Sequence, residues 1–577
     1  MRHPHLNAAH AWARGVVAGT RPACKWVRLA CQRHLDDLKR AGTQKAYPYY
    51  FDTDAAERAC EFVELLPHTK GQWAQRGERL HLEGWEAFIF VCVFGWKRTK
   101  NGTRRFRELY GEIPRKNGKS QLGAAIGLYM LIADNEAGAE VYSGATTEKQ
   151  AWEVFGPAQR MLQRTPGLRN AAGVEVWAKS LSMPADGSKF EPVIGKPGDG
   201  SSPSCALIDE FHEHDTPDLI DTMQTGMGAR SQPLTAIITT AGYNLAGPCY
   251  DKHSEVKRVL EGLIENDELF GIIFSIDLEA YEWHGVTVPA DDWADPAALK
   301  KANPNYGVSL DVDFLLAQQR RACMNPIEQN RFKTKHLNVW CSARAAWMNM
   351  QQWAMCADPG LTIDEFAGED CWLSLDLASR IDICAFNQVF KRTLNGVDHY
   401  YAFGRYYLPE DTIEESKVNQ ALYRKWVIQG YLIATDGAEI DYDVIREEVK
   451  VMGKRVNVRE VAYDPWGATQ LAHQMADDGA TVVEFAMTTK NFSPAMKEIL
   501  AAVKAGRFHH DGNPVLAWMV ANVVAKEDAN ENIFPRKEKP EQKIDGAVST
   551  IMGVARAMVH AELYPTLDTD KNPLTVI

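Results

Sequence analysis

The chain has 577 residues, a formal net charge of −12, 45% hydrophobic residues and 24% charged residues. These values predict a globular protein of about two to four domains, and they exclude a protein that coats DNA through its overall charge. The eleven cysteines form no C-x-x-C pair, and no apolar run is long enough to cross a bilayer, so we expect a cytoplasmic protein with reduced thiols and no membrane span.

The first segment, residues 1–45, is rich in Arg, His and Ala, and residues 26–41 have helical spacing. We predict an N-terminal helical arm there. From residue 46 to about residue 250, strand-like and helix-like segments alternate, and residues 251–350 are mostly helical and rich in charge. Alternation of this kind predicts a mainly parallel sheet with helices on both faces and active residues at the carboxyl ends of the strands.

Residues 112–120 read EIPRKNGKS and are typical of a phosphate-binding loop. An extended segment precedes the loop, and a helix without proline follows it at 120–133. Backbone N–H groups at the start of that helix would face phosphates, Lys119 would neutralise them, and the Ser120 hydroxyl would ligate Mg²⁺. Ile113 stands where the standard pattern has its first glycine, so the loop is a deviant version.

About ninety residues later, the apolar run Cys205–Ile208 predicts a strand buried on both faces. Asp209 ends this strand and could hold magnesium through water, and Glu210 could polarise an attacking water. An exposed Asp-Glu pair at the start of a loop is the alternative interpretation. We interpret His212 and His214 as loop residues, because a zinc protease needs two histidines four apart on a helix. A further apolar strand is predicted at 234–242.

A second pattern begins after a short acidic linker, residues 351–370. Three consecutive strands are predicted at 371–377, 383–390 and 399–408. We then expect a helix, a strand and three further helices at 423–432, 458–464, 494–505, 514–526 and 544–560. This order is typical of an RNase H-like fold. We therefore predict an RNase H-like domain over 371–565 and a loose tail over 566–577.

Four acids stand at the ends of elements in this second domain, and they are Asp376, Asp382, Asp464 and Asp545. Clustered carboxylates cannot all stay ionised without cations, which predicts two Mg²⁺ or Mn²⁺ ions serving phosphodiester cleavage. Each acid taken alone could equally be a cap or a loop carboxylate. Nearby basic residues would hold a DNA backbone or form a solvated loop, and they are Lys490, Lys497, Arg536, Lys537, Lys539 and Lys543.

Taken together, PRKNGKS, LIDE, TTAG, SLDL, AYDP and KIDG follow one another as they do in the large terminase subunit of tailed bacteriophages, and the chain resembles this family over roughly residues 60–560. The resemblance implies an N-terminal P-loop ATPase over 46–350 and a C-terminal RNase H-like nuclease.

The resemblance also implies roles for individual residues. The expected nucleotide-binding residues are Arg115, Lys116, Asn117, Gly118, Lys119, Ser120 and Asp209, with Glu210 as the catalytic base. The expected coupling residues are Thr239, Thr240, Ala241 and Gly242. The expected nuclease acids are Asp376, Asp464 and Asp545, with Asp382 as a fourth metal ligand.

The same resemblance implies a biological setting. The protein would hydrolyse ATP with Mg²⁺ to move double-stranded DNA into a capsid, and it would cut concatemeric DNA with a two-metal endonuclease. Its expected partners are DNA, a portal protein, a small terminase subunit and further copies of itself in a ring, in the cytoplasm of an infected bacterium. Residues 336–340 resemble the family's join between domains. Glu86 stands where the family's adenine-contacting glutamine is expected.

Two other readings are compatible with these motifs. A helicase-nuclease of DNA repair shares both chemistries, but a single ATPase core of about 200 residues is short of the two lobes that such helicases use. An assembly ATPase whose C-terminal domain only binds DNA is the other.

Overall fold

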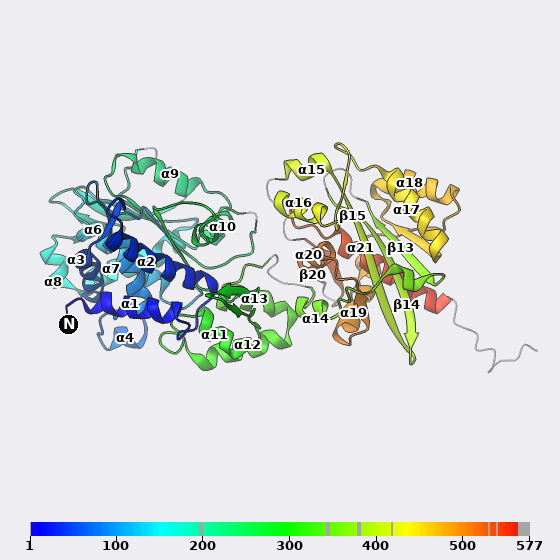
Figure 1. Cartoon of the computed structure of the whole chain (residues 1–577), viewed down its shortest axis with the longest axis horizontal. Helices are drawn as coiled ribbons and strands as arrows, with labels where there is room; N and C mark the ends of the chain where they lie inside the picture. Colours follow the sequence, from blue (N-terminus) through cyan, green and yellow to red (C-terminus); the bar gives the residue numbers. More distant parts are fainter. Residues whose placement is uncertain are drawn as a thin grey trace, which may run out of the picture. The chain divides into compact units, whose positions relative to one another are not determined.

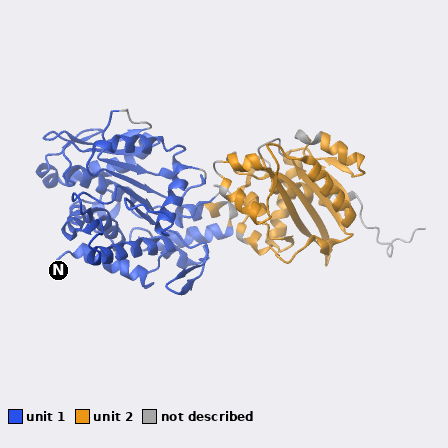
Figure 2. Ribbon diagram, turned by 45° about the horizontal axis from the view of Figure 1, so that its top comes forward, with its two compact units in different colours: residues 1–324, 331–341 blue, residues 325–330, 342–577 orange. Residues whose placement is uncertain are grey.

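The computed structural model describes residues 2–194, 200–245, 247–341, 347–377, 382–416, 419–528, 531–537 and 541–563. The chain divides into two compact units (Figure 2), one of residues 1–324 and 331–341 and the other of residues 325–330 and 342–577. The predicted tail, residues 566–577, lies outside the described residues. Among the helices that are described, none has the length and apolar character needed to cross a membrane.

An eight-stranded sheet forms the centre of the first unit (Figure 1). Neighbouring strands are parallel from β10 to β7 and antiparallel from β7 to β5. In spatial order the strands are β10 (Leu269–Ile273), β3 (Glu108–Glu112), β9 (Leu234–Thr239), β8 (Cys205–Asp209), β4 (Glu140–Ala145), β7 (Ser188–Ile194), β6 (Leu181–Met183) and β5 (Glu175–Val176). Every residue of β8 and β9 is buried, as expected for parallel strands covered on both faces. The predicted mainly parallel α/β architecture is confirmed.

Helices and short strands complete the first unit. Helix α6 follows β3 through the phosphate-loop sequence and packs against β4, β7, β8 and β9. The α-helices are α1 (Pro4–Val17), α2 (Lys25–Thr43), α3 (Thr53–Glu64), α4 (Gly71–Gln75), α5 (Gly84–Gly95), α6 (Lys119–Ile132), α7 (Glu148–Arg164), α8 (Pro166–Ala171), α9 (Asp218–Gly226), α10 (Pro248–Leu260), α11 (Pro296–Ala302) and α12 (Val312–Met324). Short elements are β1 (Tyr49–Phe51), β2 (Trp96–Arg98), β11 (Tyr281–Trp283), β12 (Val286–Val288), η1 (Phe211–Glu213) and η2 (Met227–Ala229), and α13 (Pro326–His336) includes residues of both units.

The predicted N-terminal arm is helical, and its two helices pack into the same core as the sheet. Leu6 and Ala13 of α1 and Val27 of α2 are buried in that core. An ion pair of 2.7 Å joins Asp37 of α2 to Arg105, and both side chains are at most 1% exposed. A buried pair of this kind must stay together, because removing one partner leaves an uncompensated charge. Residues 1–45 therefore belong to the compact body of the first unit.

A second sheet forms the centre of the other unit. Strands β13, β14 and β15 form an antiparallel meander, and β17 pairs parallel with β13. The strands are β16 (Ile433–Thr435), β15 (Val397–Pro409), β14 (Cys384–Leu394), β13 (Asp370–Asp376), β17 (Asn457–Tyr463) and β18 (Val482–Glu484), with β19 (Phe508–His510) paired to β15 and a separate hairpin of β20 (Val524–Glu527) and β21 (Ile533–Arg536). The predicted meander of three strands and the later strand that ends before Asp464 are present, and β16, β18, β19, β20 and β21 are additional to the prediction.

The helices of this unit are α14 (Met350–Met355), η3 (Ile363–Phe366), α15 (Glu410–Glu415), α16 (Gln420–Ile428), α17 (Tyr442–Arg455), α18 (Pro465–Asp477), α19 (Thr489–Lys504), α20 (Pro514–Asn522) and α21 (Asp545–Leu563). Helix α21 packs across β13 and β14. The helix predicted over 514–526 ends at Asn522, and the chain then enters β20. The predicted linker, residues 351–370, contributes Trp353 and Phe366 to the cores of this unit.

Gly553 lies where α21 meets the sheet. A Cβ built there would lie 2.6 Å from Val389 Cγ2 of β14. We expect Gly553→Ala to destabilise the protein by about 1–3 kcal/mol, because the packed sheet must shift to admit the methyl group. The midpoint of thermal unfolding of the full-length chain measures the effect.

The matched control is Gly453→Ala in α17, where a Cβ meets nothing within 4 Å. Alanine is the better helix former, so this variant should match or exceed the wild-type midpoint. Equal midpoints for the two variants would contradict the packing of α21 described here.

Candidate functional site

The phosphate-loop sequence connects β3 to α6 at the carboxyl edge of the first sheet. Gly118 and Lys116 adopt left-handed backbone conformations, with φ of 84° and 70°. The Lys119 ammonium is buried and donates a hydrogen bond of 3.0 Å to the Ile113 carbonyl. Burial lowers the pKa of Lys119, and the nearby charges of Glu210 and Asp209 act in the opposite direction. The lysine and the two predicted acids therefore belong to one electrostatic site.

Ile113, which replaces the usual glycine, is fully buried and is absent from the described residues with positive φ. Its N–H donates to the Thr239 carbonyl at 2.9 Å, which extends the pairing of β3 with β9 by one residue. A side chain is tolerated at this position because the backbone continues the strand.

Asparagines from a distant segment hold the loop in place. Asn117 donates to Asn303 Oδ1 at 3.0 Å and accepts from the Asn305 N–H at 3.0 Å. Asn305 Oδ1 in turn accepts from the Trp85 indole at 2.8 Å. Of these residues, only Asn117 was predicted. The others carry no local motif, because their role comes from contacts across about 190 residues of sequence.

A cavity of about 300 Å³ opens beside the loop. Lys116, Gly118 and Gln121 line one part of it, and Glu86 lines another. Burial raises the pKa of Glu86 to about 8. A carboxyl group that is neutral near pH 7 can donate a hydrogen bond as well as accept one, as the amide of the expected glutamine would.

Asp209 and Glu210 stand at the end of β8. Burial, followed by the charge of Glu210, raises the pKa of Asp209 to about 7. Glu210 has a φ of 48°, a left-handed conformation that costs a residue with a side chain about 1 kcal/mol or more. The strained turn directs the chain away from the sheet, into η1.

His212 lies on η1 and contacts both Glu210 and the predicted coupling residues. Its Nδ1 is 3.1 Å from Glu210 Oε2, 3.1 Å from Thr239 Oγ1 and 3.3 Å from Thr240 Oγ1. The interpretation of His212 as a simple loop residue misses these contacts, since its partners on β9 and beyond are 27 or more residues away.

The coupling residues Thr239–Gly242 are tied to the segment predicted as a join. Asn338 Oδ1 accepts from the Ala241 N–H at 2.7 Å, and the Cys341 N–H donates to the Gly242 carbonyl at 3.3 Å. Asn338 also donates to the Phe274 carbonyl at 2.7 Å. Residues 336–341 are therefore hydrogen-bonded directly to the predicted coupling residues.

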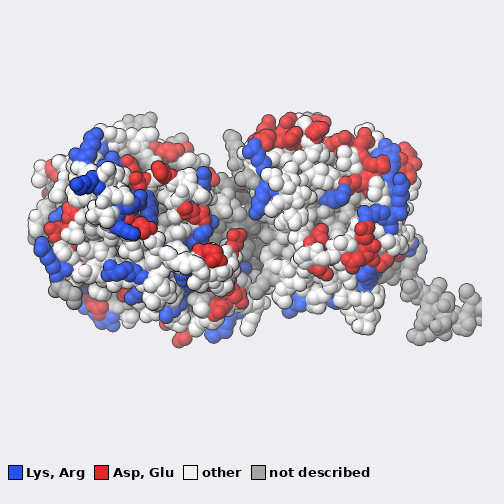
Figure 3. All heavy atoms as spheres, in the orientation of Figure 1, with Lys and Arg blue, Asp and Glu red and all other residues white. Residues whose placement is uncertain are grey.

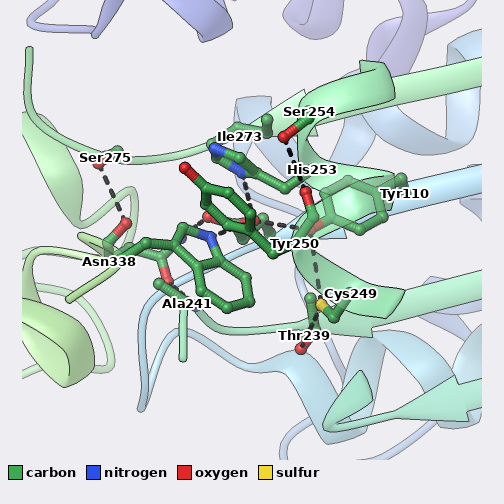
Figure 4. A network of polar contacts seen from close by, with 12 residues as sticks. Tyr110, Thr239, Ala241, Cys249, Tyr250, His253, Ser254, Ile273, Ser275 and Asn338 are labelled. Atoms are coloured by element: carbon green, nitrogen blue, oxygen red, sulfur yellow. Dashed lines mark hydrogen bonds and ion pairs between the residues drawn. The ribbon is translucent and has the colours of Figure 1, made fainter. Parts of the chain in front are cut away.

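A buried carboxylate, Glu112, accepts several hydrogen bonds in the network around this segment. It is fully buried at the end of β3 and accepts from Tyr110 at 2.6 Å, from His253 Nδ1 at 2.8 Å and from the Trp340 indole at 3.3 Å. Burial alone would raise the pKa of Glu112, but the interactions with His253, Tyr110 and Trp340 lower it overall. Figure 4 shows Tyr110, His253 and Cys249 around one part of this network and Asn338 beside Ala241 in another.

In the second unit, parallel pairing brings two of the predicted acids together. Leu375 of β13 is in register with Tyr463 of β17, so Asp376 and Asp464 are the next residues on adjacent parallel strands. Asp545 begins α21, which packs on β13. Burial, followed by the charges of Asp545 and Asp464, raises the pKa of Asp376 well above its ordinary value. Burial also raises the pKa of Asp545.

This arrangement fits divalent cations that prefer oxygen ligands. Asp545 Oδ2 is buried and has no hydrogen-bond partner, which leaves a charged oxygen available as a ligand. Within the described ranges, no three His, Cys, Asp or Glu side chains are gathered as closely as the ligands of one ion. The acids therefore share a site by topology and electrostatics, and coordination would draw them closer.

Asp382 has different neighbours from the other three acids. It forms ion pairs with Lys543 and, at 3.4 Å, with Lys537. The positive charge of Lys537 also lowers the pKa of Asp376 and of Asp545, against the effect of burial. The basic loop predicted before Asp545 thus borders the acids, although Lys539 lies outside the described residues.

Comparison with known proteins identifies relatives for both units. Residues 84–258 match the family described as "Terminase large subunit, ATPase domain", and residues 280–561 match "Terminase large subunit, endonuclease domain". Protein YmfN of Escherichia coli K12 is 48% identical over 63% of this chain and 79% of its own length. The large terminase subunit of Enterobacteria phage HK97 is 28% identical over 77% of this chain and 85% of its own. The crystal structure of the HK97 large terminase aligns with 87% of this chain and 99% of its own at 24% identity, with a TM-score of 0.41.

The raised pKa of Glu86 predicts a pH-dependent stability. Between the ordinary pKa of an unfolded glutamate and the folded value of about 8, the folded protein holds a proton that the unfolded chain releases. The contribution of Glu86 to the free energy of unfolding is fully present below the pKa of the unfolded chain, and it is lost as the pH rises through about 8. Glu86→Gln should remove this loss, so the variant should gain in thermal midpoint over wild type at pH 8.5 by more than at pH 5. A difference between the two proteins that is the same at both pH values would contradict the shift.

Proposed function

Since the chain belongs to the large terminase subunits, whose ATPase and endonuclease domains serve DNA packaging, we propose which of its residues carry out each activity. The protein is a DNA-packaging ATPase with an endonuclease. The observation that supports the assignment of residues is that each compact unit has acids where its parallel strands end, Asp209 in the first unit and Asp376 and Asp464 in the second.

In the first unit, ATP would bind across the phosphate loop with its base in the cavity beside Glu86. Lys119 would exchange its bond to the Ile113 carbonyl for the phosphates, and Arg115 would contact the γ-phosphate. Ser120 and Asp209 would hold the Mg²⁺ that accompanies ATP. Glu210 would accept a proton from the attacking water, and Thr239–Gly242 would transmit the result of hydrolysis.

In the second unit, Asp376, Asp464 and Asp545 would ligate the metal ions, and Asp382 would join them only after it releases Lys537 and Lys543. Bound there, two Mg²⁺ or Mn²⁺ ions would activate water and stabilise the leaving oxygen of a phosphodiester. The two lysines would then be free to hold the DNA backbone.

Double-stranded DNA would bind this protein through local clusters of basic side chains. On the face shown in Figure 3, acidic and basic side chains are interspersed on both units, in keeping with the net charge of −12. Binding would therefore depend on a few lysines and arginines and would weaken as salt rises. We further propose a ring of copies docked on a portal protein, supplied with DNA by a small terminase subunit, in the cytoplasm of the infected host.

A helicase-nuclease of DNA repair is the second candidate function, because both chemistries are present. The described part of the chain has one nucleotide-binding sheet, in the first unit, whereas such helicases use two tandem lobes. Unwinding of a forked duplex would favour this alternative. An assembly ATPase that only binds DNA is the third, and it predicts no cleavage.

The first test separates the two activities at the motor site. We expect Lys119→Ala to lower ATP hydrolysis by about 100-fold or more, because the charge facing the phosphates is lost. Metal-dependent plasmid cleavage should persist, since the acids that perform it lie in the other unit. Lys149→Ala, on an exposed position of α7, is the matched control for loss of a lysine. Loss of cleavage in a folded Lys119→Ala protein would show that the two sites are not independent.

The second test addresses the nuclease acids. Asp376→Asn keeps the shape of the side chain but removes a charged ligand, and cleavage in Mg²⁺ or Mn²⁺ should fall by about 100-fold or more while ATP hydrolysis continues. Asp370→Asn, at the opposite end of β13, is the matched control and should cut normally. If wild type hydrolyses ATP but does not cut, the assembly ATPase becomes the better description.

A further inference from the structure

His212 lies between Glu210, the proposed base, and the proposed coupling residues Thr239 and Thr240. One ring nitrogen, Nδ1, is 3.1 Å from the carboxylate of Glu210, and the other, Nε2, is 3.3 Å from Glu213. The side chain is only 7% exposed. The two hydroxyl groups of Thr239 and Thr240 complete its surroundings.

The contacts of Nδ1 compete with one another. An imidazole nitrogen carries at most one hydrogen, yet Nδ1 has three oxygen atoms within 3.3 Å, on Glu210, Thr239 and Thr240. The hydrogen bond from Nδ1 to Glu210 is the strongest of the three when the carboxylate is charged and turned towards the ring. When Glu210 turns towards a water, the same N–H is free to donate to a threonine.

Thr239 and Thr240 connect this choice to the rest of the unit. The Thr239 hydroxyl accepts from the backbone N–H of His212 at 3.2 Å and donates to the Thr240 carbonyl at 3.1 Å. Ala241, the next residue, is held by Asn338, as Figure 4 shows. One peptide bond, between Thr240 and Ala241, and one hydrogen bond therefore connect the Thr239–Thr240 pair to Asn338.

Close packing fixes the ring relative to the coupling residues. A Cβ built on Gly242 would lie 2.9 Å from His212 Cβ and 3.1 Å from the Trp340 ring. The backbone of the coupling motif therefore lies directly against His212 and Trp340, and a movement of one must displace the others.

We propose that His212 is a positioning residue that links the orientation of Glu210 to the position of the coupling residues 239–242. The proposal rests on the assignment of Glu210 as the base. In one arrangement the imidazole holds the Glu210 carboxylate, and in the other it holds Thr239 or Thr240 while Glu210 faces the attacking water. Each hydrolysis event would then shift the coupling residues and, through Asn338, the segment that ends the ATPase unit.

Steady-state ATP hydrolysis by the full-length protein, with and without linear double-stranded DNA, tests this proposal. His212→Ala keeps the Cβ that packs on Gly242 but removes the ring nitrogens. We expect KM for ATP to stay within about twofold, kcat to fall about tenfold, and stimulation by DNA to be lost, because one hydrogen bond to a charged group is removed from the catalytic step. His212→Asn, whose amide N–H lies near the place of Nδ1, should recover kcat to within about threefold of wild type.

A double-mutant cycle distinguishes a shared pathway from separate structural effects. Thr240→Val should lower DNA stimulation in the same way, and His212→Ala combined with Thr240→Val should be no worse than His212→Ala alone. The matched control is His284→Asn, an exposed histidine with a φ of 49° that asparagine tolerates. It should behave as wild type. The midpoint of thermal unfolding of the first unit reports that each variant is folded.

Three results would overturn the proposal. If His212→Ala keeps the wild-type kcat and DNA stimulation while Glu210→Gln is inactive, His212 has no positioning role, and the assignment of Glu210 as the base stands. Effects of His212→Ala and Thr240→Val that multiply would show that the two side chains act independently. Wild-type hydrolysis by Glu210→Gln would remove the base assignment itself and, with it, the premise of this proposal.

Discussion

Parallel pairing of strands that are far apart in the sequence is the constraint on which both sites depend. In the first unit, β3, β9 and β8 end at one edge, which brings the phosphate loop, Thr239 and Asp209 together. In the second unit, β13 and β17 do the same for Asp376 and Asp464. Carboxylates gathered in this way repel one another and lose hydration, and the raised pKa values of Asp209 and Asp376 express that cost. A cation bound beside such carboxylates would offset this cost.

Buried hydrogen bonds connect the parts of the proposed nucleotide site to one another. Glu112 collects hydrogen bonds from β3, α10 and the segment at 338–340, and Asn117 is held by Asn303 and Asn305. Such groups are costly to leave unpaired in a buried site, so their arrangement is specified closely. The consequence is that loop, coupling motif and the last residues of the ATPase unit have few independent positions.

The sequence was sufficient for features whose signal is local. The phosphate loop, the Asp209-Glu210 pair, each strand of the β13–β15 meander and the acids that end strands are each recognisable from a short stretch of sequence, and the fold confirms the mainly parallel sheet and the meander. His212, Asn305 and Asn338 could not be found in the same way, since each acts through partners 27 to 220 residues away. Residues 1–45 show a related limit. Helical spacing over residues 26–41 predicts α2 but not the buried pair of Asp37 with Arg105 that ties it to the first unit.

The left-handed backbone of Glu210 has a consequence for how this protein can be improved. At a φ of 48°, glycine or asparagine would relieve strain that glutamate must bear. Selection for heat resistance alone would therefore favour replacing the residue that we propose as the catalytic base. Efforts to stabilise this enzyme should keep Glu210 and change other positions, because at this position thermal stability and the proposed catalytic role favour different residues.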